Sequence, residues 1–332
     1  AGWYVLIGIC AAVPCLMVLV LLLMSADMVF ADLLVRFAGV FRFPVKLLRI
    51  LLMLVFGFLS SYCGVRYVQK HAADIKPSAG KTAEPLIAIA FTAPIAVLYL
   101  LFSAIQIVYL FIGNMQLPAG VTYAEYARRG FFQLLFVCVL NLAAVLSIQS
   151  YFKENRVLKA LLLAISGCTL IMTASSACRM LLYIRAYQLT FLRVSVLVAL
   201  AVIALLMAGV IAKIVKPQFP LFRYGFVLVG AVYLVFSFSH VDYFIAAYNL
   251  THTSWEASGE ETVDYSYLYT LSTDAAPAIE KYAGKSGAAD YRKQGWYQLY
   301  CEANEEALNE TGLRTYNVSH AVAKQLLMED NR

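Results

Sequence analysis

Seven apolar runs constrain the fold of this chain more than any other feature of its sequence. They comprise residues 2–24, 45–65, 85–112, 131–152, 157–184, 192–215 and 220–239. A helix needs roughly 20 apolar residues to cross the hydrocarbon core of a bilayer. Because lipid offers no partner to backbone amides and carbonyls, runs of this length fold as helices. The sequence therefore predicts an all-α, polytopic membrane protein with about seven spans.

The composition of the chain agrees with that prediction. Of its 332 residues, 62% are hydrophobic, and the mean hydropathy is +0.73. A soluble domain is typically about half apolar. The chain begins Ala-Gly-Trp, with neither an initiator Met nor a basic segment before the first apolar run. We interpret that run as a span and not as a signal peptide, and we expect further residues upstream.

The charge is divided unevenly along the chain. Residues 1–239 hold 19 Lys/Arg and 6 Asp/Glu, a net charge of +13, whereas residues 240–332 hold 7 and 14, a net charge of −7. The basic residues flank the spans, which argues against a nucleic-acid partner. We predict a transmembrane domain followed by an acidic, soluble helical tail. Interfacial helices are expected near residues 28–43 and 121–130.

A capping box precedes the fourth run, in the segment 121–132 that reads VTYAEYARRGFF. Thr122 and Glu125 have the spacing at which side chains and backbone amides exchange hydrogen bonds at a helix start. Glu125 then lies one turn from Arg128 and Arg129. The segment is typical of a capped helix with its arginines at the lipid headgroups, and a functional site is the alternative.

A polar stripe runs along the fifth apolar run. Ser175, Arg179, Tyr183 and Tyr187 recur every four residues and therefore share one face of a helix. Arg193 follows at the start of the next run. Arg179 lies near the end of its run, where it either extends to the membrane surface or pairs inside the helix bundle.

Asn141 lies at the middle of the fourth run. An asparagine at that depth predicts a hydrogen bond between helices, and a ligand contact is the alternative. The candidate polar cluster consists of Tyr123, Glu125, Arg128, Arg129, Asn141, Arg179, Tyr183, Tyr187 and Arg193.

The tail contains helix signals but no metal-binding pattern. Ser272 and Asp274, followed by Pro277, predict a helix start. Further helices are expected at residues 288–310, weakened at Gly295, and at residues 318–329, started by Asn317 or Ser319. Asp274, like Asp264, is interpreted as a cap and not as a catalytic acid. The histidines lack ligand spacing, and six of the seven cysteines lie in apolar runs. The sequence thus predicts no metal, no cofactor and no catalytic residue.

The basic residues of the membrane part suggest its orientation. The loops after the second, fourth and sixth spans hold ten, and the other loops hold nine, of which two lie within spans. The positive-inside rule then places the first set of loops in the cytoplasm and the tail outside.

Four motifs resemble one bacterial family of multi-pass membrane proteins, domain of unknown function four-one-seven-three, related to four-one-five-three. They are TYAEYARRGFF at 122–132, RMLLYIRAYQLT at 179–190 with Arg193, IAAYNL at 245–250 and DYSYLYTLSTDAAPAI at 264–279. The resemblance implies a topology and a set of important residues, but no reaction. Beyond the candidate polar cluster, these residues are Tyr126, Gly130, Asn249, Asp264, Ser272, Asp274 and Pro277. Gln188 stands where the family pattern has a glycine, so the turn after the fifth span is expected to differ.

Three classes of function remain open. The first is an envelope scaffold or sensor subunit in the bacterial cytoplasmic membrane, which binds a membrane or envelope protein through its outer rim and tail. The second is a transporter or channel with polar groups of spans three to six lining a path. An intramembrane enzyme is third, since Glu125 has no paired nucleophile or base.

Overall fold

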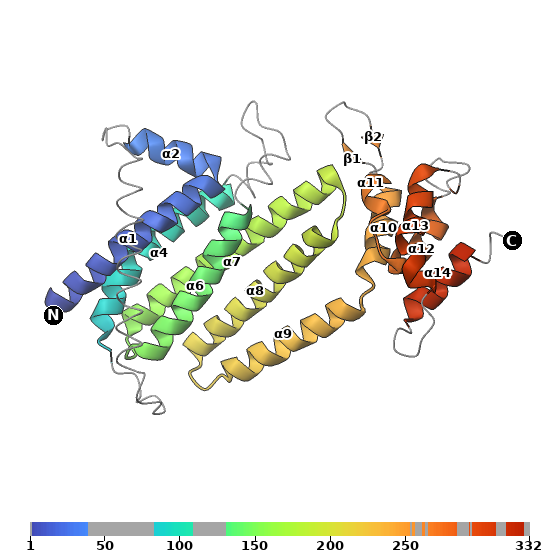
Figure 1. The fold of residues 1–332 in the computed structure, drawn as a ribbon. Coiled ribbons are helices and arrows are strands. Elements are labelled where there is room, and N and C mark those ends of the chain that lie inside the picture. Colours follow the sequence, from blue (N-terminus) through green and yellow to red (C-terminus); the bar gives the residue numbers. More distant parts are fainter. Residues whose placement is uncertain are drawn as a thin grey trace. The chain divides into compact units, whose positions relative to one another are not determined.

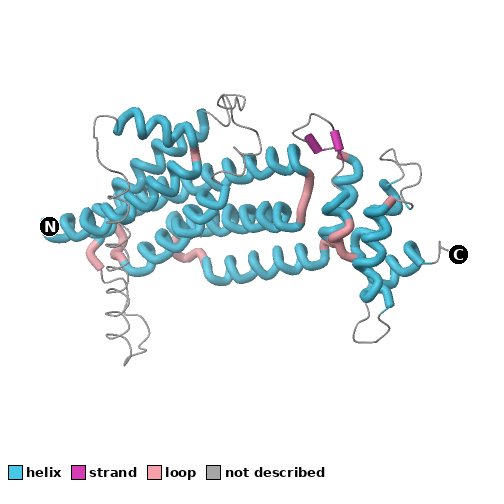
Figure 2. Tube along the Cα trace, turned by 45° about the horizontal axis from the view of Figure 1, so that its top comes forward, coloured by secondary structure: helices cyan, strands magenta, loops and turns pink. Residues whose placement is uncertain are grey.

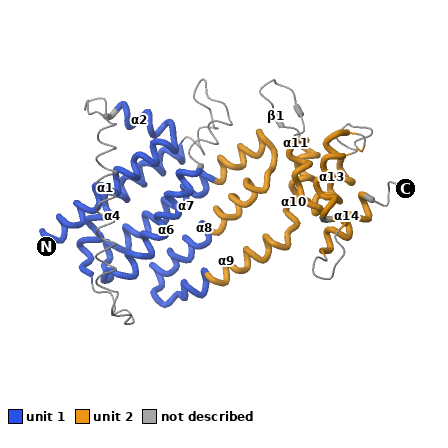
Figure 3. Tube along the Cα trace, in the orientation of Figure 1, with its two compact units in different colours: residues 1–120, 129–176, 203–225 blue, residues 121–128, 177–202, 226–332 orange. Residues whose placement is uncertain are grey.

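A computed structural model describes residues 2–38, 83–108, 131–252, 254–255, 261–262, 265–283, 292, 294–309 and 317–328. The chain divides into two compact units, which Figure 3 distinguishes by colour. The first unit comprises the described residues up to Ser176 together with residues 203–225. The second comprises residues 177–202 and the described residues from Phe226 onward. Three of the long helices, those at residues 156–187, 191–215 and 221–238, therefore contribute to both units.

Within the described residues, six helices are long and apolar enough to cross a membrane (Figure 1). They are α1 (Gly2–Ala26), α4 (Pro85–Gln106), α6 (Phe131–Tyr151), α7 (Arg156–Tyr187), α8 (Phe191–Val215) and α9 (Leu221–Phe238). Each of them matches one predicted run, which confirms the all-helical, multi-pass class of fold. The predicted run at residues 45–65 lies outside the described residues, so that span stays a prediction.

Glycine permits close packing of helices in the first unit. A Cβ atom at Gly8 of α1 would lie 2.5 Å from the Ile87 carbonyl oxygen and 2.6 Å from the Ala90 Cβ atom of α4. A Cβ atom at Gly209 of α8 would likewise collide with the ring of Tyr224 in α9. Because lipid tails are as apolar as leucine, close packing of this kind is a main source of helix association in membranes.

A short helix, α2 (Met28–Ala38), follows the first span where an interfacial helix was predicted. Asp32 and Arg36 form an ion pair of 2.9 Å on its exposed face. Phe30 faces the opposite way, is 0% exposed and packs edge to face with Phe102 of α4. The helix is thus amphipathic, and its position at a membrane surface stays a prediction. The other predicted interfacial helix, at residues 121–130, lies outside the described residues.

The second unit ends in a small helical domain, which we call the tail. Its elements are α10 (Val241–Thr251), α11 (Tyr265–Leu268), η2 (Thr273–Ala275), α12 (Ala276–Tyr282), α13 (Gly295–Asn309) and α14 (Val318–Met328), with a two-residue antiparallel pair of strands, β1 (Ser254–Trp255) and β2 (Glu261–Thr262) (Figure 2). The most deeply buried side chains come from five of the helices: Ile245, Leu268, Ile279, Tyr300 and Ala323 are each 0% exposed. The tail therefore has a hydrophobic core of its own.

The helix starts predicted for the tail are largely confirmed. Pro277 lies in the first turn of α12. Asn317 precedes α14, and its Oδ1 accepts a hydrogen bond of 2.9 Å from the Ser319 amide. The helix predicted at residues 288–310 begins at Gly295, where only a weak point was expected. The helix α10 was not predicted, because its residues continue the apolar composition of the span before it.

Candidate functional site

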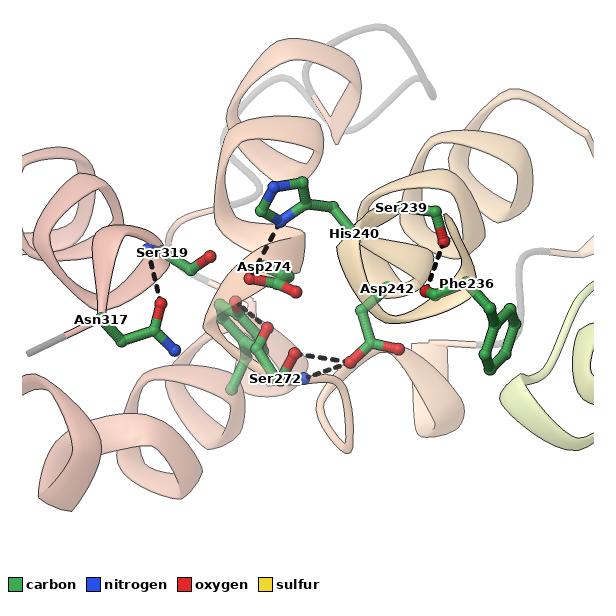
Figure 4. A network of polar contacts seen from close by, with 9 residues as sticks. Phe236, Ser239, His240, Asp242, Ser272, Asp274, Asn317 and Ser319 are labelled. Atoms are coloured by element: carbon green, nitrogen blue, oxygen red, sulfur yellow. Dashed lines mark hydrogen bonds and ion pairs between the residues drawn. The ribbon is translucent and has the colours of Figure 1, made fainter. Parts of the chain in front are cut away.

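Ser272 is the centre of a cluster of polar contacts in the tail (Figure 4). Its backbone amide donates to Asp242 Oδ2 over 3.1 Å, and its hydroxyl donates to the same oxygen over 2.6 Å. Its carbonyl oxygen accepts a hydrogen bond of 2.9 Å from the Tyr300 hydroxyl. Burial raises the pKa of the Tyr300 phenol, so this group remains a donor at neutral pH. Ser272 therefore connects α10 and α13 to the start of η2.

Ser272 stands at the N-cap position of η2, so the predicted helix start is confirmed. Its side chain makes no capping hydrogen bond to η2, because the hydroxyl donates to Asp242 of α10 instead. The interpretation of Asp274 as a cap is wrong, because this residue lies within η2. Its Oδ1 is 3.4 Å from Nδ1 of His240. His240 has a φ of 48° and separates α9 from α10. The Asp274 carboxylate thus joins this helix junction to η2, as Figure 4 shows.

A pocket of about 570 Å³ lies beside the pair of His240 and Asp274, and we call it the tail pocket. Ser319 adds a hydroxyl to its polar side. Its apolar lining includes Tyr243, Phe244, Pro277, Val318 and Val322. Phe244 is 61% exposed, Val318 is 64% exposed and Val322 is 38% exposed. The tail pocket therefore combines a carboxylate and an imidazole with a rim of exposed apolar side chains.

The turn between α7 and α8 is held by Asn249 of α10. The Oδ1 atom of Asn249 accepts from the Leu189 amide over 2.8 Å, and its Nδ2 donates to the Leu189 carbonyl over 2.9 Å. Asn249 is 1% exposed. Nearby, the Phe191 amide at the start of α8 donates to the Tyr267 hydroxyl over 2.9 Å. Side chains of the tail thus form hydrogen bonds with backbone groups of the α7–α8 turn that have no partner within a helix.

Gln188 lies in this turn with a φ of 64°, in the left-handed region that glycine adopts most readily. This conformation accounts for the glycine that the family pattern has at this position. The side chain adds a contact that glycine lacks, because Nε2 donates to the His252 carbonyl over 2.8 Å. Arg193 Nη1 donates to the carbonyl oxygens of Tyr187 and Gln188 at the end of α7. A cation there also complements the helix dipole.

The polar stripe of α7 is partly brought together with Arg193. The rings of Tyr183 and Tyr187 are 5.2 Å apart, and the Arg193 guanidinium lies 4.3 Å from the centre of the Tyr183 ring, a distance typical of a cation–π contact. Arg179 is 1% exposed. Its side chain is therefore buried and does not extend to the surface. The pairing of Arg179 inside the helix bundle stays a prediction.

Asn141 of α6 connects three spans within the first unit. The Tyr99 hydroxyl of α4 donates to Asn141 Oδ1 over 2.6 Å, and Asn141 Nδ2 donates to Thr169 Oγ1 of α7 over 2.9 Å. Thr169 donates in turn to the Ile165 carbonyl over 2.7 Å. Asn141 is 5% exposed and the other two side chains are fully buried. The prediction of an interhelical hydrogen bond is thus confirmed.

A second buried network in the first unit was not predicted. Asp27 Oδ1 accepts from the amides of Val29 and Phe30, both over 2.9 Å, which caps α2. Its Oδ2 accepts from Gln106 Nε2 over 2.8 Å, and Gln106 Oε1 accepts from the Ser175 hydroxyl over 2.5 Å. No role was predicted for Asp27 from the sequence. The preference of aspartate for the N-cap position was the available signal.

Several predicted site residues lie outside the described residues. These are Tyr123, Glu125, Tyr126, Arg128, Arg129, Gly130 and Asp264, and their roles stay predictions. The remaining members of the candidate polar cluster fall in different units, since Asn141 belongs to the first unit and Arg179, Tyr183, Tyr187 and Arg193 belong to the second. Asp242 and His240 were missed, because their partners are 30 and 34 residues away in sequence.

The structure thus has the features of an integral membrane protein with a helical tail. The chain belongs to the family described as domain of unknown function (DUF4153), whose model matches residues 1–282. The motifs of the sequence resembled domain of unknown function four-one-seven-three, to which DUF4153 is related. Membership of the family four-one-seven-three stays a prediction. Comparisons with curated proteins and with solved structures gave no match. The matched segment ends with α12, so α14, which forms one wall of the tail pocket, lies beyond it.

Proposed function

We propose that this protein is an envelope scaffold or sensor subunit of the bacterial cytoplasmic membrane, and that its tail binds a partner protein outside the cell membrane. The observation that carries the proposal is the tail pocket. Exposed apolar side chains that surround a cavity are unusual on a soluble surface and mark sites of association. Phe244 and Val318 are each more than 60% exposed at the rim of this pocket.

Charge favours a partner segment that carries a basic group beside an apolar anchor. The tail has a net charge of −7, and Asp274 places a carboxylate in the pocket next to His240. An apolar side chain that fills the cavity would supply the contact energy, and a cation near Asp274 would supply specificity. The fixed position of η2, which Ser272 connects to α10 and α13, supports a site that exists before the partner arrives.

The transport alternative has weaker support. It requires polar side chains that line a path, and Asn141 was the candidate deepest in the membrane. Both ends of its amide are engaged by Tyr99 and Thr169, which is the pattern of a helix cross-link. We therefore place the partner-binding function first.

Site-specific photo-crosslinking in cells tests the proposal. A benzophenone amino acid replaces Val318 at the pocket rim, and in a matched control it replaces Leu299 of α13, which is 48% exposed and does not line the pocket. We expect one protein adduct from position 318 and none from position 299. The crosslinked peptide should contain basic residues beside an apolar one. Phe244→Asp and Asp274→Asn should each reduce the yield about fivefold or more, the effect of losing one good contact.

Three results would overturn the proposal. Adducts with lipid alone would mean that the rim lies against the bilayer. Adducts with a second copy of this chain would make the pocket a contact between copies. Equal yields from positions 318 and 299 would mean that the pocket has no selective occupant.

A further inference from the structure

A second pocket lies at the end of the first unit where α6 turns into α7 and α8 turns into α9. We call it the lysine pocket; its volume is about 330 Å³. Three lysines line it, Lys153, Lys159 and Lys213. Leucines of three spans, among them Leu146, Leu162 and Leu221, form its apolar wall. Such a combination fits a ligand with an anionic group and an apolar body.

The lysines differ in how their charge is balanced. Lys153 pairs with Glu84 at 3.1 Å, and Lys159 pairs with Glu154 at 2.9 Å. Lys213 Nζ donates to the Pro217 carbonyl over 2.6 Å, and among the described residues no carboxylate forms an ion pair with it. Its positive charge is therefore available to an anion in the pocket.

Two further cations flank lining residues of the lysine pocket in the sequence. Arg156 and Lys216 are exposed and adjoin the lining residues Asn155 and Pro217 in sequence. Together with the three lysines they give five positive charges, whereas Glu84 and Glu154 give two negative charges. The pocket and its rim thus carry a net positive charge.

The backbone around the lysine pocket is fixed. Ala83, just before α4, donates its amide to the Tyr151 carbonyl over 3.2 Å and accepts from the Lys153 amide over 3.1 Å. This short bridge ties the α6–α7 turn to α4. Asn155 adds a cap at the start of α7, since its Oδ1 accepts from the Val157 amide over 2.8 Å. Little ordering is then needed when a ligand enters.

The surroundings of the pocket determine the class of ligand. The turns after α6 and α8 join helices long and apolar enough to span a membrane, so we place these turns at a membrane surface. By the distribution of basic residues, these turns belong to the cytoplasmic side, where anionic lipids attract lysine and arginine. We infer that the lysine pocket binds the phosphate headgroup of an anionic membrane phospholipid, with Lys213 as its principal charged contact.

Native mass spectrometry of the full-length chain in detergent tests this inference. The probes are phosphatidylglycerol, phosphatidylcholine and glycerol 3-phosphate, each added at the same concentration. We expect one retained phosphatidylglycerol, which Lys213→Gln weakens about fivefold, the effect of one lysine at an anionic surface. Ser150→Phe should fill the pocket and displace the lipid with no change of charge. Arg36→Gln is the matched control, because Arg36 lies in α2, is 80% exposed and does not line the pocket.

Each other outcome would overturn the inference. Equal weakening by Arg36→Gln and Lys213→Gln would mean that only net charge matters. Equal retention of phosphatidylcholine would exclude selection for an anionic headgroup. Equal affinity for glycerol 3-phosphate would make the ligand a soluble phosphate. Circular dichroism should show that the variants remain folded, and a lipid that stays bound to folded Ser150→Phe would place its site elsewhere.

Discussion

Two buried asparagines show how differently the membrane helices and the tail use polar groups. The side-chain amide of Asn141, in the middle of a span, bonds to the side chains of Tyr99 and Thr169. Asn249, in the tail, bonds to the backbone amide and carbonyl of Leu189. A span already satisfies its own backbone, so its asparagine can only connect neighbouring helices. At a turn the backbone lacks helical partners, and the asparagine takes their place.

The largest effect is expected from removal of the tail asparagine. Asn249→Ala leaves two partly buried backbone groups of Leu189 without these partners, at up to about 1–3 kcal/mol each. We expect a loss of roughly 3 kcal/mol in the free energy of unfolding, measured by denaturant titration in detergent. Asn155→Ala, which removes only a cap at the start of α7, should cost about 1 kcal/mol. Equal losses of stability in the two variants would show that the backbone contacts of Asn249 add nothing beyond the effect of one helix cap.

Two substitutions of Gln188 distinguish the contribution of its backbone conformation to stability from that of its side chain. Gln188→Ala retains the left-handed backbone and loses the hydrogen bond to His252, so it should destabilise the protein by about 1–2 kcal/mol. Gln188→Gly loses the same hydrogen bond but relieves the backbone strain, so it should remain within about 1 kcal/mol of the natural protein. Thermal unfolding of both variants measures the difference. If Gln188→Gly were no more stable than Gln188→Ala, the left-handed backbone at this position would not be strained.

The membrane asparagine should matter less. Hydrogen bonds between membrane helices contribute about 0.6 kcal/mol on average, so Asn141→Leu should cost roughly 1 kcal/mol or less. Because Tyr99→Phe removes the same contact, the double variant should lose less than the sum of the two single variants. Unfolding in detergent micelles gives the three values. A cost for Asn141→Leu as large as that for Asn249→Ala would remove the contrast between the two regions.

The smallest effect concerns pH and the Tyr300 phenol. Burial raises its pKa above the ordinary value of about 10, so the folded tail holds a proton that the unfolded chain releases. Its contribution to stability is therefore complete below pH 10 and declines as the pH rises beyond it. Tyr300→Phe also loses the hydrogen bond to Ser272 and should be less stable at pH 8. The difference between natural protein and variant should narrow above pH 10; a constant difference would contradict the raised pKa.

The membrane spans could be predicted because one physical requirement governs them. Long apolar runs fold as helices wherever backbone groups must be satisfied within the segment, and six such runs became α1, α4, α6, α7, α8 and α9. The α12 and α14 starts followed from local chemistry, a proline in the first turn and an asparagine cap. The hydrogen bond from the Ser272 hydroxyl to Asp242 could not be predicted, because nothing in the local sequence indicates an acceptor 30 residues away.

The sequence alone determined which segments are helices and where the charge changes sign, since apolar runs and charge are properties of neighbouring residues. Only the tertiary structure decided the partners of each polar group. Tyr99 meets Asn141 across 42 residues of chain, Leu189 meets Asn249 across 60, and Asp27 meets Gln106 across 79. Helix periodicity fixes the face on which a side chain lies, but the packing of that face against a distant helix selects its partner, because many pairs of faces satisfy the same apolar pattern.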